Sequence, residues 1–189
     1  MTHNHIFDPK HAAFLESETR KAWQDPKEIL ELLTITTQMV AADLGCGNGF
    51  FTVPLSCKTK KVYGIDVQKE MLELLEQKLC KLKIENIELR LSGEKTIPLD
   101  DKHVDLLITV NTLHEFPDRT KTIKEIQRVL KPNGHVLIVD FKKEETPHGP
   151  PVQIRVSQLQ AKQLFEEQGF SLIKSHELLY HYVLVFRRD

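Results

Sequence analysis

The chain has 189 residues, 40% of them hydrophobic and 28% charged, which is typical of one globular domain with a sizeable core. Its formal net charge of -1 argues against a nucleic-acid partner, and no apolar run approaches the roughly 18 residues needed to cross a membrane. The first residues lack the pattern of a secretory signal, and Cys46, Cys57 and Cys80 form no CxxC pair, so we expect a reduced, cytoplasmic setting.

Short apolar runs alternate with helical patterns along the chain. Residues 1–35, with Trp23 and a helix candidate near Pro26–Leu33, are expected to form a cap on the single domain that residues 36–189 build. Strand-like runs follow at Met39–Leu44, Lys61–Ile65, Ile87–Leu91, Val104–Val110 and His135–Phe141. Because strands that alternate with helices pair in parallel, the pattern predicts an α/β fold with a doubly wound sheet.

Two stretches between these strands carry the periodic apolar face of a helix. The first face consists of Met71, Leu75, Leu79 and Leu82, and the second of Ile123, Ile126 and Leu130. Asp118 is placed to cap the second helix, and Pro132 with Gly134 would end it.

The C-terminal stretch breaks the alternation. "FSLIKSHELLYHYVLVFRRD" reads as two successive strands with a tight connection near Glu177–Tyr180, which predicts an antiparallel hairpin at one edge of the sheet. The charged, proline-rich segment 142–151 is expected to be a loop.

Three glycines, Gly45, Gly47 and Gly49, directly follow the first core strand in "VAADLGCGNGFF". Glycines at the carboxyl end of a strand permit a tight turn and a close approach of ligand to backbone. The dinucleotide fingerprint GxGxxG fails here, because its third glycine position is Phe50. A turn without ligand is the alternative interpretation.

Two acids accompany this loop. Asp43 lies two residues before the first glycine, where a carboxylate repels pyrophosphate but suits a ligand with an ammonium and a sulfonium. Asp66 ends the second strand and is placed to accept the hydroxyls of a ribose, although a helix N-cap is also compatible with its position.

These motifs, with "VYGIDVQKEML", "IPLDDKHVDLLITVNTLHEF" and "VLKPNGHVLIVDF", resemble a class I S-adenosylmethionine-dependent methyltransferase. The sequence is most similar to the group of ubiquinone and menaquinone biosynthesis methyltransferases, over roughly residues 25–187. The resemblance implies a Rossmann-like sheet of seven strands, mostly parallel, whose final strand is antiparallel. It also implies S-adenosylmethionine as cofactor and S-adenosylhomocysteine as product.

The resemblance also assigns roles to residues. Asp43 would face the amino group of the cofactor and Asp66 the ribose, and the loop residues Gly45, Cys46, Gly47, Asn48 and Gly49 would lie against the methionine portion and the ribose. Val67 and Met71 would flank the adenine, and Asn111, Thr112 and Leu113 would pass under the sulfonium. The family commonly has an acid at the position of Gly93, and here the acid follows at Glu94, so the adenine contact falls to Glu94 or to backbone alone.

Candidate groups for the acceptor lie where later strands end. We expect His114 and Glu115 to be catalytic, since the pKa range of histidine suits proton transfer near neutral pH. Asp140 and Lys142, after the fifth strand, are candidates for substrate contacts, as are His5 and Phe7, which would cover the cofactor as a lid. The nine histidines show no zinc-binding spacing, so no metal is expected.

The chain is short for a separate recognition domain, which favours a small-molecule acceptor. Methylation of a protein side chain and a catalytically silent cofactor-binding role remain open. A nicotinamide-dependent dehydrogenase is the least favoured alternative, because of Phe50 and the lack of a substrate domain. The acceptor itself and the oligomeric state are not specified by these patterns.

Overall fold

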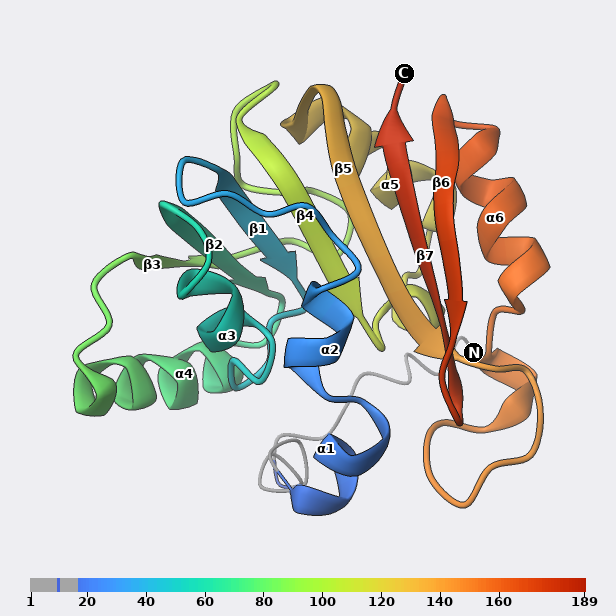
Figure 1. The fold of residues 1–189 in the computed structure, drawn as a ribbon, viewed down its shortest axis with the longest axis horizontal. Coiled ribbons are helices and arrows are strands. Elements are labelled where there is room, and N and C mark those ends of the chain that lie inside the picture. The colour runs from blue at the N-terminus through green and yellow to red at the C-terminus, as the bar shows by residue number, and fades with distance from the viewer. Residues whose placement is uncertain (1–9, 11–16) are drawn as a thin grey trace.

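The computed structural model describes Lys10 and residues 17–189, which form a sheet of seven strands in the order β3-β2-β1-β4-β5-β7-β6 (Figure 1). The strands are β1 Val40–Leu44, β2 Lys61–Asp66, β3 Ile87–Leu91, β4 Val104–Val110, β5 Leu130–Phe141, β6 Phe170–Glu177 and β7 His181–Arg188. β1 to β5 pair in parallel, and β7 lies antiparallel between β5 and β6. The predicted fold class and the C-terminal hairpin are confirmed.

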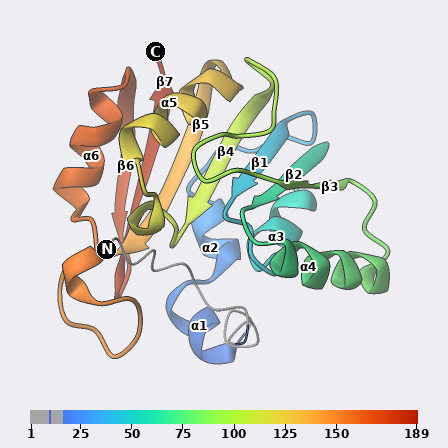
Figure 2. The same ribbon diagram turned by 180° about the vertical axis from the view of Figure 1, so that it is seen from behind.

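Helices cover both faces of the sheet (Figures 1 and 2). They are α1 Glu18–Trp23, α2 Pro26–Leu30, α3 Thr52–Ser56, α4 Lys69–Leu82, α5 Arg119–Val129 and α6 Gln158–Glu166, with 3-10 turns η2 Leu113–Glu115 and η3 Val152–Ile154. Side chains of β4 alternate between two cores: Leu107 packs with residues of α5 and α6, and Leu106 and Ile108 pack with residues of α2 and α3. Both cores are continuous across the parallel strands, as a doubly wound sheet requires.

Two helix predictions need correction. α5 ends at Val129, earlier than Pro132, because Leu130 already has extended backbone (φ -71°, ψ 140°) and begins β5. In α4 the buried stripe includes Leu72, while Leu82 is 53% exposed at the last helical position. The buried stripe of α4 therefore ends at Leu79.

The N-terminal helices place side chains against the rest of the fold. α2 contributes Ile29 and Leu30 to the core, and α1 lies beyond the carboxyl ends of the parallel strands, at the bottom of Figure 1. Within the described part of the chain, no helix is long and apolar enough to span a membrane. The position of α1 brings it to the edge of the sheet at which ligands bind in open α/β folds.

Candidate active site

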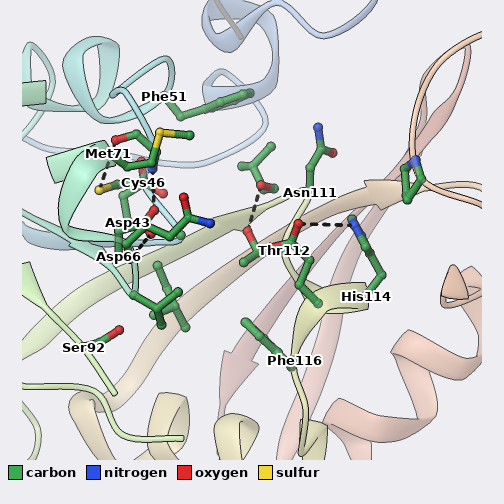
Figure 3. Close-up of a pocket in the computed structure, with 18 of the residues that line it drawn as sticks. Asp43, Cys46, Phe51, Asp66, Met71, Ser92, Asn111, Thr112, His114 and Phe116 are labelled. Atoms are coloured by element: carbon green, nitrogen blue, oxygen red, sulfur yellow. Dashed lines mark hydrogen bonds and ion pairs between the residues drawn. The ribbon is translucent and has the colours of Figure 1, made fainter. Parts of the chain in front are cut away.

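A cavity of about 430 Å³ lies at the carboxyl ends of β1, β2 and β4. Figure 3 shows Asp43, Asp66 and Met71 grouped at one end and His114 at the other, with Asn111 and Thr112 between them. Of the sequence-predicted residues, the following line it: Asp43, Gly45, Cys46, Gly47, Asn48, Asp66, Val67, Met71, Gly93, Glu94, Asn111, Thr112, His114 and Glu115. The volume is within the range of small-molecule sites.

The glycine loop is held by backbone bonds to the neighbouring strand. The amides of Gly45 and Cys46 both donate to the carbonyl of Ile65, at 2.8 and 3.0 Å. Gly45 has φ +77° and lies so close to the next strand end that an added Cβ would be 2.5 Å from Thr112. The first glycine is therefore required by the approach of residue 112 as well as by its backbone angle.

The third glycine does not line the cavity, which corrects its predicted role. Gly49 has φ +85°, and an added Cβ would overlap the side chain of Leu75, which is fully buried in α4. Gly49 thus allows the loop to pack on α4, and its contribution to ligand contact is indirect.

Two buried carboxyl groups flank the loop. The Asp43 carboxylate accepts a 2.6 Å hydrogen bond from the Thr52 hydroxyl, and burial raises the pKa of Asp43 to about 7. The Asp66 carboxylate accepts from the amides of Gly47 and Gln68, both at 2.9 Å, and burial raises its pKa as well. Both oxygens of Asp66 have lone pairs left for a further donor in the cavity.

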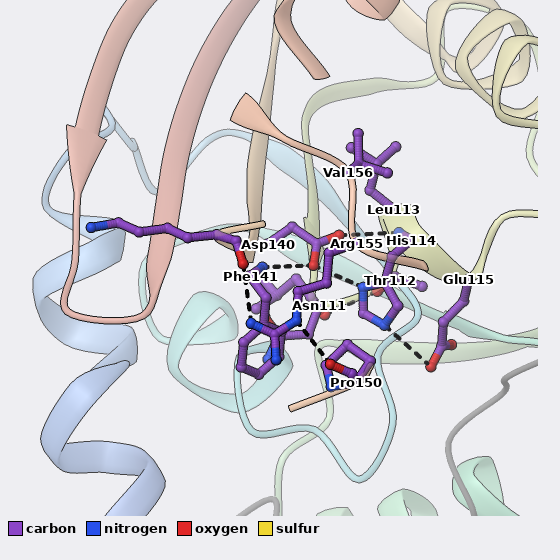
Figure 4. A network of polar contacts seen from close by, with 12 residues as sticks. Asn111, Thr112, Leu113, His114, Glu115, Asp140, Phe141, Pro150, Arg155 and Val156 are labelled. Carbon is purple, nitrogen blue, oxygen red and sulfur yellow. Dashed lines mark hydrogen bonds and ion pairs between the residues drawn. The ribbon is translucent and has the colours of Figure 1, made fainter. Parts of the chain in front are cut away.

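His114 lies in η2, directly after β4, and is oriented by a buried acid (Figure 4). Its Nδ1 lies 2.8 Å from Oδ1 of Asp140, and its backbone amide donates to Oδ2 of the same carboxylate at 3.1 Å. Burial lowers the pKa of His114, but the charge and hydrogen bond of Asp140 outweigh this, and the net shift is upward. Nε2 lies 3.9 Å from the carboxylate of Glu115.

Asp140 itself is fully buried and does not line the cavity, so its predicted substrate contact is wrong. Its carboxylate is occupied by His114 and by the amide of Phe141 at 2.7 Å. Lys142 also does not line the cavity, because its ammonium pairs with Glu177 at 3.2 Å. Leu113 is buried in the core, and the predicted contacts of His5 and Phe7 lie outside the described residues.

Sequence reasoning missed a group of residues from α1. Arg20 and Trp23 line the cavity, and the Arg20 guanidinium lies 4.5 Å from the centre of the Phe50 ring. Nε of Arg20 donates to Gln24, whose side-chain amide exchanges two hydrogen bonds with that of Asn111 at 3.0 and 3.1 Å. Burial lowers the pKa of Arg20 to about 10, so it stays charged at neutral pH.

A second missed feature is the wall behind Trp23. The Trp23 ring stacks on His181 at 5.1 Å, and Phe141 lies 4.1 Å from the same imidazole. Burial lowers the pKa of His181 to about 3, so it is neutral and serves as an aromatic surface. Trp23 was noticeable as the one tryptophan of the chain, but its partners lie more than 100 residues away, and no local pattern identifies them.

Known proteins share this architecture. A family described as "Methyltransferase domain" matches residues 35–183. A S-adenosylmethionine-dependent methyltransferase structure from Aquifex aeolicus has a TM-score of 0.92 and 33% identity, over 97% of this chain and 100% of that one.

Curated relatives agree. Demethylmenaquinone methyltransferases of Staphylococcus aureus (strain MRSA252) and Bacillus mycoides (strain KBAB4) are 31% and 29% identical over 133 and 126 residues. These matches cover 69% and 65% of this chain, and 54% and 52% of the relatives, so the chain spans about half of their length. With the matched domain and the confirmed fold, they show that this chain belongs to the class I S-adenosylmethionine-dependent methyltransferases, in the methyltransferase domain family.

Proposed function

We propose that this enzyme binds S-adenosylmethionine in the 430 Å³ cavity and methylates a small-molecule acceptor there. One observation carries the proposal: the glycine loop, Asp66 and His114, from three different strand ends, line the same cavity. The volume of the cavity, which is within the range of small-molecule sites, favours a small acceptor over a protein side chain. By their names, the curated relatives act on demethylmenaquinone, which makes a quinone precursor the first acceptor to test.

The cavity fits the cofactor chemically. The free lone pairs of Asp66 suit the ribose hydroxyls, and the buried Asp43 suits the ammonium group. The charged Arg20, held by Gln24, is placed for the carboxylate of the methionine portion. Val67 and Met71 provide apolar surface for the adenine, and Glu94 also lines the cavity.

When bound, the cofactor supplies an activated methyl group on a sulfonium. The protein has to orient the acceptor and exclude water. Trp23, Phe116 and Phe141 form apolar walls of the cavity. We propose that residues 1–35 close it as a cap, and Arg20 and Trp23 are the described residues of this segment that line the cavity.

His114 is our candidate for the group that takes a proton from the acceptor. Because the Asp140 carboxylate can only accept, the neutral imidazole carries its proton on Nδ1 and its lone pair on Nε2, beside Glu115. A raised pKa makes this nitrogen a stronger base. The role given to Asp140 is to position His114 and to stabilise the imidazolium.

Calorimetry with S-adenosylhomocysteine and NAD in parallel tests the cofactor. We expect S-adenosylhomocysteine to bind and to stabilise the fold by about 2.7 kcal/mol at about 100 times its dissociation constant. Binding of NAD without S-adenosylhomocysteine would contradict the proposal.

Turnover tests the acceptor side. We expect S-adenosylhomocysteine release with a short-chain demethylmenaquinone analogue in reduced form, and a loss of about 10²–10⁴-fold in His114→Ala with cofactor affinity nearly unchanged. Lys124→Ala, an exposed change on α5 outside the cavity, is the matched control. Full turnover of His114→Ala would assign proton transfer to another group.

A further inference from the structure

A second hollow lies on the other side of His114 and is not used by the proposed cofactor contacts. It is an open groove of about 770 Å³ between the start of α5, η3 and α6. His114 and Pro117 line both this groove and the cavity. A molecule in the groove would therefore lie next to the proposed base.

Cations outnumber acids along this groove. Four basic side chains line it, Lys95, Arg119, Lys143 and Arg155, against two carboxylates, Asp118 and Glu167. Among the described residues, none of the four basic groups forms an ion pair with a carboxylate. The Asp118 carboxylate caps α5 by accepting from the Lys121 amide at 3.0 Å.

The two arginines are fixed by backbone carbonyls. Arg155 is 4% exposed and donates to the carbonyls of residues 142, 144, 148 and 150 in the loop after β5 (Figure 4). Most N–H groups of the Arg155 guanidinium are engaged in these bonds, so its role is to shape the groove and to add positive charge. Arg119 donates to the carbonyls of Leu113 and His114, both at 3.2 Å, and keeps donors for a ligand.

We propose that the groove binds an anionic group of the methyl acceptor, a carboxylate or a phosphate, through Arg119, Lys95 and Lys143. The inference rests on the proposed function for the existence of an acceptor, and it implies that a quinone precursor with a carboxylate or a phosphate binds better than demethylmenaquinone, which has neither. A planar guanidinium held at a fixed place, with two lysines beside it, is an arrangement that recognises oxyanions. The rest of the acceptor would reach the cavity past His114, where the two spaces meet.

Sulfate is a suitable probe, because its charge does not change over the pH range in which histidine titrates. Sulfate would be added to the full chain saturated with S-adenosylhomocysteine, with sodium chloride at equal ionic strength as reference, and the His114 ring followed by NMR. The charged groups around this ring are Asp140, Glu115 and Arg119. We expect bound sulfate to raise the pKa of His114 by about half a unit relative to chloride.

Variants locate the anion. We expect the double variant Lys95→Gln/Lys143→Gln to bind sulfate about five-fold more weakly, since each rim charge contributes modestly. Lys124→Gln, an exposed lysine of α5 outside the groove, should leave sulfate affinity unchanged. Neither variant should alter the affinity for S-adenosylhomocysteine.

The outcomes separate the two proposals. No response to sulfate beyond that to chloride, or equal affinity in the double variant, overturns the anion site. Sulfate binding without any change in the pKa of His114 also overturns it, because the anion would then be too far from the reaction centre to belong to the acceptor. A wild-type protein that does not bind S-adenosylhomocysteine refutes the proposed function instead.

Discussion

Replacing Gly49 with alanine separates the packing role of the glycine loop from its ligand role. The backbone angle of +85° is unfavourable for a residue with a Cβ, which costs about 1–2 kcal/mol. The new methyl group would also overlap Leu75, which is fully buried, and overpacking of this kind costs about 1–3 kcal/mol. Together these terms lower the free energy of unfolding by about 2–5 kcal/mol.

Thermal and denaturant unfolding would measure this loss. For a chain of this size we expect the melting temperature to fall by about 4–20 °C. Calorimetry below the transition should show nearly normal affinity for S-adenosylhomocysteine, because Gly49 does not line the cavity. The double variant Gly49→Ala/Leu75→Ala should lose about 1–3 kcal/mol less stability than the two single variants together, because the smaller side chain at position 75 leaves room for the methyl group.

Gly47→Ala is the matched control. Its φ of +51° lies in the region that non-glycine residues can adopt, so the expected stability loss is only about 1–2 kcal/mol. Gly47 lines the cavity, and we expect its cofactor affinity to fall by tenfold or more. Equal loss of affinity in folded Gly49→Ala and Gly47→Ala would refute the separation of roles.

Three further changes test the buried acids and one tests the groove wall. Asp66→Ala should weaken S-adenosylhomocysteine binding by about 1.5–3 kcal/mol in calorimetry, and unchanged affinity would show that another group holds the ribose. Because the pKa of Asp43 is raised from 3.8 to about 7, the folded state binds the extra proton between these values, so stability falls as pH rises through this window. Asp43→Asn should remove this slope from a series of unfolding curves, and a slope that persists would place it elsewhere. Asp140→Asn should lower the pKa of His114 measured by NMR. It should also reduce the contribution of His114 to folding stability, which is present below the pKa of this residue in the unfolded chain and is lost as pH rises through its pKa in the folded protein. Arg155→Lys should destabilise the protein by about 2–4 kcal/mol and speed amide hydrogen exchange at 142–150, whereas native protection there would contradict its anchoring role.

The position of the site could be predicted because parallel strands end at the same edge of a sheet. Asp43, Asp66 and His114 are 71 residues apart at most, yet each lies within four residues of the carboxyl end of a core strand. Once the strands are identified, the topology of the sheet alone predicts that these three residues lie close together. The glycine loop between the first strand and its helix was recognisable for the same reason.

What could not be predicted depends on contacts between distant segments. Glycine is needed at position 49 because Leu75 packs against it, and at position 45 because Thr112 does, and the loop sequence indicates neither partner. Arg155 lies outside every motif, and its structural role depends on hydrogen bonds to backbone carbonyls of a loop that come close to it only in the folded protein. The glycine pattern shows that bare backbone is needed without showing what approaches it.

The three strand-end acids show how donor groups, more than position, decide what an acid does. Asp43, Asp66 and Asp140 each lie in the carboxyl half of a buried strand, and the sequence assigns all three to ligands. The Asp66 oxygens accept from the glycine loop and from α4 and still line the cavity. The Asp140 oxygens are occupied by the amide and ring of His114 in η2 and by the amide of Phe141. A buried carboxylate whose oxygens are all hydrogen-bonded can act only through the groups that donate to it. For Asp140, the donor that can take part in proton transfer is the imidazole of His114.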